Sequence, residues 1–414
     1  MNAPRAVRTP FAAAILVFPA LLLVLALRSG LPWDPIGEPP RYFAFASQVF
    51  QGLVPYRDVP LEYPPLALVP WLLPRVVAID VHSYAWVLAI QNAALAASVA
   101  VCLVWLAGRG WSALSPTTVL ATSLLLLLGV AHVVVWLFDL VPALLVALAL
   151  VAVVRERPGW AGVLLALGGL VKLFPLVLVP VLLLWYLAAQ QRRSAGRLLI
   201  ATVVTIGVVM IPLVLVAGSG AFSFLVYQQE RGAQLEGLPA GIAMLVALLG
   251  GAPTTLVHAF GACEIDGQLA HSLVAVQAPL LVAGLALLLG VCALRFRQDR
   301  RELGAIPPAR LIAFATAAVL LLMVVNKVLS PQFLVWLLPL VPLLPRGQAA
   351  VAVAASLLTN VFLGTNYEGL MQQRWELVLL LDLRNLLLVV LLAWLIVANL
   401  PSRSSTSSVV LTAR

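Results

Sequence analysis

Charge is scarce in this sequence. Only 10% of the 414 residues are charged, 63% are hydrophobic, and the mean hydropathy is +1.07. A soluble globular protein could not cover its surface with so few polar groups. Apolar runs of about 17 to 25 residues, the length that crosses a bilayer, recur along the chain. The composition therefore excludes a soluble domain and indicates a polytopic membrane protein.

Cysteine and clustered metal ligands are also lacking. Cys102, Cys263 and Cys292 are widely spaced and form no disulfide framework. No His, Asp or Glu cluster has the spacing of a metal site, so we expect neither a metal nor a cofactor. A net charge of +9 would suggest nucleic acid in a soluble chain. Here the arginines fall in short loops and tails, so we expect no nucleic-acid partner.

The apolar runs predict an all-α bundle of about ten spans, with additional surface or re-entrant helices, over residues 1–401. The expected spans are residues 11–29, 84–107, 117–135, 138–154, 198–217, 271–294, 310–326, 333–345, 348–364 and 377–399. Arg5 and Arg8 precede the first run, which reads as a retained signal anchor rather than a cleaved signal peptide. An even number of spans predicts that both termini are cytoplasmic in the plasma membrane. The polar tail, residues 402–414, is expected to be disordered.

The block at residues 160–188 has basic residues at both ends, which places both ends on the cytoplasmic side. It would then enter the membrane and return as a hairpin. Gly168-Gly169 and the segment from Lys172 to Pro175 supply the break. The alternative is one long tilted span.

The loop at residues 31–83 concentrates acidic and basic side chains beside the bilayer, where ionisable groups are costly and therefore suggest function. Residues 41–51 predict a short surface helix with an apolar side. Residues 64–79 are apolar but interrupted by prolines, so a surface or re-entrant segment fits them better than a span. The plain alternative is a solvated outer loop, in which Asp58 only pairs with Arg57.

Lys172 and Lys327 are the only lysines in the chain, and both lie at or near membrane depth. Every other Lys or Arg position holds arginine, which indicates that these two positions require a compact ammonium charge of the kind that suits a phosphate group. The alternative is a lysine that snorkels from the end of a span. Asp139 and Arg231 are expected at the same outer face, although Asp139 could instead cap a helix.

A series of motifs runs through the chain in a fixed order. The first loop carries an acid four residues before a tyrosine, followed by a glycine, a Pro-Tyr pair and a Tyr-Pro-Pro motif: Glu38, Tyr42, Gly52, Pro55-Tyr56 and Tyr63-Pro64-Pro65. Four more follow: Phe138-Asp139-Leu140, residues 171–175, residues 227–232 and residues 326–336. Together they resemble glycosyltransferase family 87.

The resemblance implies a GT-C architecture and transfer of a sugar at the outer face, from a polyprenyl phosphate to a glycolipid or a cell-envelope glycan. Mannose is the sugar it favours, with arabinose as the alternative. In the family, the acid before the tyrosine is usually Asp and acts as the catalytic base. This chain has Glu38 there, which leaves Asp34 as the other candidate.

The chemistry agrees with this reading. A sugar phosphodiester has a good leaving group, so one carboxylate base and cations for the departing phosphate suffice, with inversion at the anomeric carbon. The candidate residues are Glu38 or Asp34 as base, Lys327, Arg231 and Lys172 for the donor phosphate, and Tyr42, Tyr56, Asp58, Glu62, Tyr63, Asp139 and Gln332 for sugar or acceptor.

Two other classes of function stay open. A secondary transporter or a flippase for lipid-linked sugars would place its charges near the bilayer midplane on broken helices, and the Lys172 break fits that pattern. An inactive scaffold of the same fold is the third possibility, because glutamate replaces the usual aspartate. Loss of Glu38 would abolish transfer but not transport.

Overall fold

The computed structural model describes residues 5–28, 37–364 and 366–401. Asp34, one of the two candidate bases, and the tail at residues 402–414 lie outside the described residues. The α-helices are α1 (Arg5–Arg28), α2 (Glu38–Phe50), α3 (Leu68–Val77), α4 (Val81–Gly108), α5 (Pro116–Gly129), α6 (Ala131–Val134), α7 (Leu140–Val154), α8 (Pro158–Val171), α9 (Leu178–Ala188), α10 (Arg192–Ala217), α11 (Ser223–Glu230), α12 (Leu238–Leu248), α13 (Gln268–Ala275), α14 (Gln277–Leu303), α15 (Pro308–Val324), α16 (Arg346–Leu363), α17 (Tyr367–Met371) and α18 (Trp375–Val397). The 3-10 helices are η1 (Pro65–Ala67), η2 (Phe174–Val177), η3 (Gly218–Phe222), η4 (Pro331–Leu337) and η5 (Val341–Leu343).

The chain is an all-α membrane bundle, as its composition predicts. Among the described residues, six helical segments are long and apolar enough to cross a bilayer: Thr9–Arg28, Val81–Gly108, Arg192–Glu230, Gln268–Leu303, Arg346–Leu363 and Trp375–Val397. Shorter apolar helices pack among them, and the figure of ten spans stays a prediction. The outer sides of α10 and α14 expose rows of apolar side chains, as surfaces covered by lipid do.

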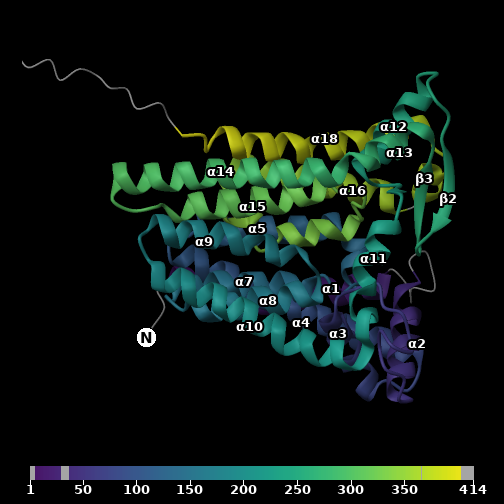
Figure 1. Ribbon diagram of the computed structural model, residues 1–414, viewed down its shortest axis with the longest axis horizontal. Helices are drawn as coiled ribbons and strands as arrows, with labels where there is room; N and C mark the ends of the chain where they lie inside the picture. Colours follow the sequence, from purple (N-terminus) through teal and green to yellow (C-terminus); the bar gives the residue numbers. More distant parts are fainter. Residues whose placement is uncertain (1–4, 29–36, 365, 402–414) are drawn as a thin grey trace, which may run out of the picture.

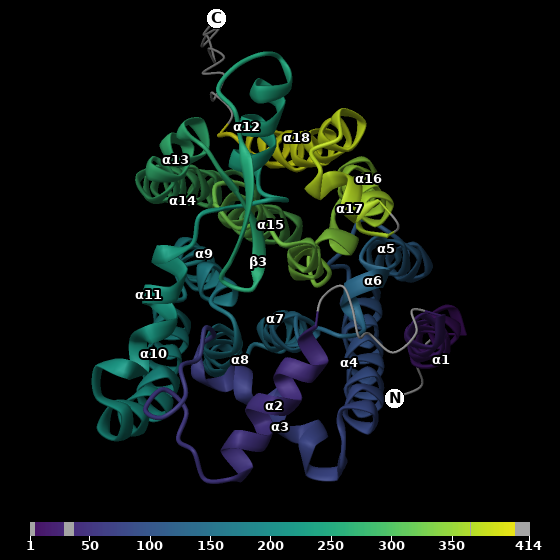
Figure 2. The same cartoon turned by 90° about the vertical axis from the view of Figure 1, so that its right-hand side faces the viewer.

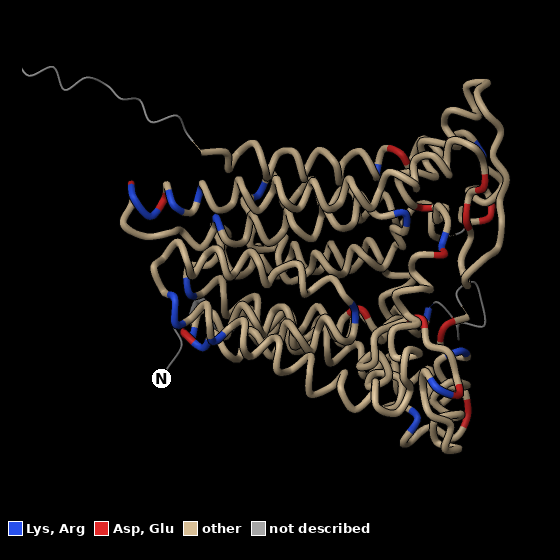
Figure 3. Tube along the Cα trace, viewed as in Figure 1, with Lys and Arg blue, Asp and Glu red and all other residues tan. Residues whose placement is uncertain are grey.

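The long helices run side by side along the longest axis of the molecule (Figure 1). Basic residues, which are arginines, crowd at one end of the bundle, whereas most Asp and Glu residues lie toward the other end, among further basic residues (Figure 3). We call these the basic end and the acidic end. Helix α7 ends and α10 begins at the basic end, beside Arg155 and Arg192. The acidic end carries α2, α3, α11 and the small sheet (Figure 2).

The hairpin predicted for residues 160–188 is confirmed. Helix α8 ends at Val171, Lys172 is extended, and the chain returns through η2 and α9. The backbone N–H of Lys172 donates to Gly168 O, which closes the last turn. The alternative of one tilted span is therefore wrong.

Helix α2 forms where the sequence predicts a surface helix, but it begins at Glu38 rather than Arg41. Gly37 adopts a left-handed φ of 58°, and two prolines occupy the first helical turn, where their missing N–H groups cost nothing. The segment at residues 64–79 is confirmed as non-spanning, because it forms only η1 and the ten-residue α3.

Two segments differ from the expected topology. The turn between α5 and α7, expected in an outer loop, is buried throughout residues 133–140. Asn92 on α4 donates hydrogen bonds of 2.8 and 3.0 Å to the carbonyls of Val135 and Leu137. Residues 333–345, expected as a helical span, form η4 and η5 and are also largely buried. Irregular backbone is tolerated at membrane depth where protein rather than lipid surrounds it.

A three-stranded antiparallel sheet at the acidic end is the element that the sequence reading missed. Strand β3 (Ala262–Asp266) lies between β1 (Ala233–Gln234) and β2 (Thr255–Ala259). The β2–β3 hairpin crosses the face of the acidic end (Figure 2). Gly261 at its tip has φ +67°, and a Cβ there would lie 3.0 Å from Arg41 Nη1, so the tip reaches α2.

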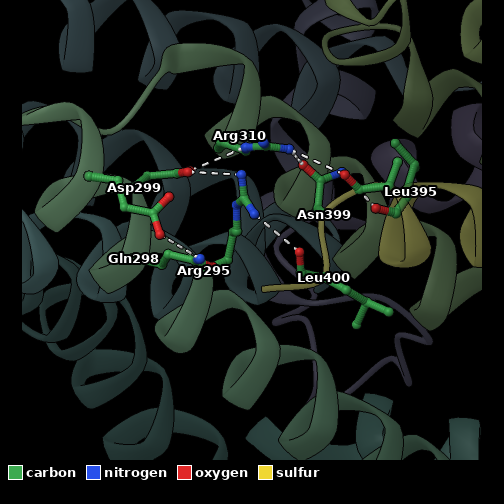
Figure 4. A network of polar contacts seen from close by, with 9 residues as sticks. Arg295, Gln298, Asp299, Arg310, Leu395, Asn399 and Leu400 are labelled. Carbon is green, nitrogen blue, oxygen red and sulfur yellow. Dashed lines mark hydrogen bonds and ion pairs between the residues drawn. The ribbon is translucent and has the colours of Figure 1, made fainter. Parts of the chain in front are cut away.

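At the basic end, a polar network joins α14, α15 and α18 (Figure 4). Asp299 is fully buried and pairs with Arg295 at 3.1 Å and with Arg310 at 3.2 Å. Arg310 also donates to Asn399 Oδ1 at 2.5 Å. These contacts fix the helix ends far from the acidic end.

Candidate active site

Glu38 stands at the start of α2, and its side chain is 12% exposed. Its Oε2 atom lies 3.7 Å from Arg41 Nε and has no hydrogen-bond partner among the described residues. Arg41 pairs in addition with Glu62, across the loop. The Glu38 carboxyl is therefore sheltered from water, and its Oε2 atom can still accept a hydrogen bond or a proton.

Burial raises the pKa of Glu38 above its usual value, while Arg41, Tyr42 and Lys172 act in the opposite direction. A carboxylate with a raised pKa is a better proton acceptor near neutral pH than an ordinary surface carboxylate. The electrostatics thus suit a general base.

An aromatic cluster lies behind Glu38. The Tyr42 ring stacks on Trp71 with centroids 4.5 Å apart, and Phe138 meets the edges of Trp71 and Tyr63 at 5.6 and 5.0 Å. Tyr42 is completely buried, and its hydroxyl lies near enough to the Glu38 carboxyl to lower the pKa of Glu38, although the two groups do not meet the geometry of a hydrogen bond. In this structure the Tyr42 ring faces other side chains rather than open space.

Three breaks in helical structure meet beneath this cluster. Asp139 precedes α7, Lys172 follows α8, and Trp336 lies in η4. Asp139 Oδ1 accepts from Lys172 Nζ at 2.6 Å and from Trp336 Nε1 at 2.7 Å. Asp139 makes no side-chain hydrogen bond that caps α7.

Aromatic rings also enclose the Lys172 ammonium. Its Nζ lies 5.0 to 5.6 Å from the ring centroids of Tyr63, Phe138, Phe333 and Trp336. Lys172 is 7% exposed, so its charge is neutralised by Asp139 and by the ring faces rather than by water. It would have to leave Asp139 to contact a phosphate directly.

A second group of charges lies around the end of α11: Arg231 follows this helix, Glu264 lies on β3, and Lys327 follows α15. Arg231 Nε is 3.8 Å from Glu264 Oε1, and Lys327 Nζ donates to Gln229 O at 2.7 Å. Burial lowers the pKa of Lys327, Arg231 lowers it further, and Glu264 opposes them. Glu264 pairs with Arg231 and also raises the pKa of Lys327, whose Nζ atom donates to a backbone carbonyl.

Three other candidates, Tyr56, Asp58 and Gln332, make local contacts of their own. The Tyr56 hydroxyl donates to Tyr63 O. Asp58 accepts from Arg57 and from the Val54 N–H, and these hydrogen bonds lower its pKa to about 2. Asp58 is thus committed to a turn at the surface. Gln332 is half-buried in η4.

The structure adds residues that sequence reasoning missed: Trp71, Arg41, Glu264 and Asn92. Trp71 lies in the segment at residues 64–79, where the sequence reading considered only the prolines. Glu264 lies on a strand that the sequence did not predict. Within the described ranges, no three or more His, Cys, Asp or Glu residues are grouped so that they could hold a metal ion.

Comparison with known protein families gives one match over most of the chain. Residues 61–324 match glycosyltransferase family 87, which is more than half of the chain and includes Tyr63, Asp139, Lys172 and Arg231. Glu38 and Lys327 flank the matched region. No curated protein and no solved structure matches the chain. By the extent of the family match, this chain belongs to glycosyltransferase family 87.

Proposed function

We propose that this glycosyltransferase moves mannose from a polyprenyl phosphate to a glycolipid or cell-envelope glycan at the outer face of the plasma membrane. One observation carries the proposal. Glu38, a sheltered carboxylate whose Oε2 atom accepts no hydrogen bond from the described residues, begins α2, and the cation Arg231 follows α11, which lies with α2 at the acidic end (Figure 2). Lys327 reaches the last turn of α11 through Gln229 O. A proton acceptor and a phosphate-binding cation pair are what the reaction needs.

The proposed reaction is a single displacement. Glu38 accepts the proton of an acceptor hydroxyl as that oxygen attacks the anomeric carbon. The bond from the anomeric carbon to the phosphate oxygen breaks, and its electron pair leaves with the polyprenyl phosphate. Lys327 and Arg231 stabilise this negative charge. Attack opposite the leaving group inverts the anomeric centre.

The other candidates take supporting roles in this proposal. Lys172 acts through its positive field on Glu38, whose pKa it lowers. Glu62 and Gln332 contact sugar or acceptor hydroxyls, Tyr63 and Asp139 line the site beneath them, and Asp58 supports the loop through its surface turn. Tyr42 and Tyr56 pack behind these residues and hold them in place. Asp34 stays the alternative base.

The orientation of the site rests on charge. Basic residues crowd at one end of the bundle, and cytoplasmic loops are enriched in Lys and Arg (Figure 3). We therefore place the basic end in the cytoplasm, with both chain termini, and the acidic end with Glu38 outside. A lipid donor reaches this end through the membrane.

The test uses membranes that contain the wild type, Glu38→Gln, Asp34→Asn or Glu376→Gln. Glu376 is a carboxylate near the start of α18, paired with Arg374, and serves as the matched control. Labelled polyprenyl-phosphate mannose and a glycolipid acceptor pool are supplied, and labelled product is counted. We expect loss of at least about a thousandfold in Glu38→Gln alone, which corresponds to about 4 kcal/mol of barrier.

Other outcomes assign the reaction differently. Loss in Asp34→Asn alone moves the base to Asp34. Transfer only from the arabinosyl donor changes the sugar. If correctly inserted wild type transfers neither sugar, the proposal is wrong.

A transporter or flippase is the second candidate, because the Asp139–Lys172 pair lies buried at a helix break. Uptake of a lipid-linked sugar analogue into vesicles that survives Glu38→Gln but not Lys172→Met would favour it.

A further inference from the structure

The segment from Arg231 to Gly237 connects the two cations of the proposed donor site. Arg231 begins it, and Gln234 N donates to Lys327 O at 3.0 Å. Ser330 Oγ donates to Gln234 Oε1 at 2.9 Å, which adds a second contact to the Lys327 loop. A Cβ on Gly237 would lie 3.0 Å from Lys327 O, so the two backbones pack closely. A shift of this segment would therefore move both cations.

Two residues from distant helices hold the segment from beneath. Arg384 on α18 donates to Glu236 O at 3.0 Å. Tyr367 on α17 donates to Glu236 Oε1 at 2.8 Å. Glu236 is 3% exposed and Arg384 is completely buried. Sequence reasoning assigned no role to Glu236, Tyr367 or Arg384.

The burial of Arg384 is hard to explain by stability alone. It lies nine residues into α18, about 14 Å along the helix axis. Its Nε and Nη1 atoms, and both carboxylate oxygens of Asp382 nearby in sequence, have no hydrogen-bond partner among the described residues. A buried, incompletely paired charge costs stability, and such groups inside membrane proteins commonly serve function.

We propose that Arg384 and Tyr367 are positioning residues for donor binding: through Glu236 they fix the segment at residues 231–237 and thereby place Lys327 and Arg231 on the donor phosphate. This inference rests on the proposed function. Neither residue touches the donor. Their loss weakens donor binding without a matching effect on the acceptor.

The experiment measures the KM for donor and acceptor and the Kd for polyprenyl monophosphate by calorimetry on purified protein. The variants are Tyr367→Phe, Arg384→Met and Arg384→Lys. Tyr367→Phe removes one hydrogen bond, so we expect donor KM and the Kd to rise about fivefold while acceptor KM is unchanged. Arg384→Met raises both donor constants more, and Arg384→Lys restores part of the loss.

Arg310→Met is the matched control, because Arg310 belongs to a buried polar network at the opposite end (Figure 4). It should lower Tm but leave both donor constants unchanged. If Arg384→Met does not fold, Tyr367→Phe still tests the proposal, because it removes only one hydroxyl. An unchanged Kd in Tyr367→Phe, or an equal rise of donor and acceptor KM, would overturn the inference.

The binding assay separates this inference from the proposed function. If wild type binds polyprenyl monophosphate but transfers no sugar, the proposed reaction fails, and the Kd values of the variants still decide the inference. If wild type does not bind polyprenyl monophosphate, both are wrong.

Discussion

Lys172 Nζ lies 2.6 Å from Asp139 Oδ1, although 33 residues separate them in the chain. The pair is almost entirely excluded from water, with side chains 9% and 2% exposed. It joins the end of α8 to the start of α7 beneath the aromatic cluster that contains Tyr63.

Removing one partner of this pair should destabilise the protein strongly. Asp139→Leu leaves an uncompensated buried cation, so we expect a loss of about 3 to 5 kcal/mol in the free energy of unfolding. The double variant with Lys172→Met should recover much of that loss, because no charge stays buried. Unfolding of purified protein in detergent measures both, and additive losses would contradict the coupling.

The acid limb of the pH profile should report Glu38. A base is active when deprotonated, so kcat/KM falls as pH drops through its pKa, which burial raises above the usual 4.5. Arg41→Met removes a cation that lowers this pKa, so its acid limb should move to higher pH. The measurement is kcat/KM against pH for both proteins. An acid limb that does not move would show that another group titrates.

The alkaline limb should report Lys327. Burial lowers the pKa of its ammonium below 10.5, so donor binding weakens as pH rises through that value. Arginine stays protonated throughout this range, so Lys327→Arg should shift the alkaline limb of kcat/KM upward. Lys327→Met should raise donor KM at every pH. If Lys327→Arg keeps the limb of the wild type, the titrating cation is not Lys327.

Close packing of α8 and α10 gives a prediction for stability. A Cβ on Gly162 would lie 2.3 Å from Leu198 O, whereas one on Gly196 meets nothing within 4 Å. Gly162→Ala must separate the helices and should cost about 1 to 3 kcal/mol. Gly196→Ala should stabilise the protein by about 0.5 to 1 kcal/mol through lower backbone entropy. Thermal unfolding of the two variants checks the contrast, and equal shifts would refute the close approach.

The sequence by itself determined the class of fold and several local elements. Hydropathy and charge are properties of each segment, so the membrane bundle, the α2 surface helix and the break at Lys172 could be predicted without knowing their neighbours. The ordered motifs likewise predicted the family. Charge is rare in this chain, so Glu38, Lys327 and Arg231 stand out in the sequence as candidates for the site.

Only the tertiary structure decided which of these groups meet. Asp139 was expected in an outer turn, yet it lies against Lys172, because Asn92 satisfies the carbonyls of a turn that could not otherwise be buried. The η4 and η5 segments lie in the interior without forming an α-helix for a similar reason. Protein rather than lipid surrounds them, so their backbone polar groups can find partners. The sheet depends on pairings between distant residues, and so do the contacts of the segment at residues 231–237 with Arg384 and with Lys327. Hydrogen bonds of this kind leave no periodicity in the sequence, so their partners become visible only in the folded chain.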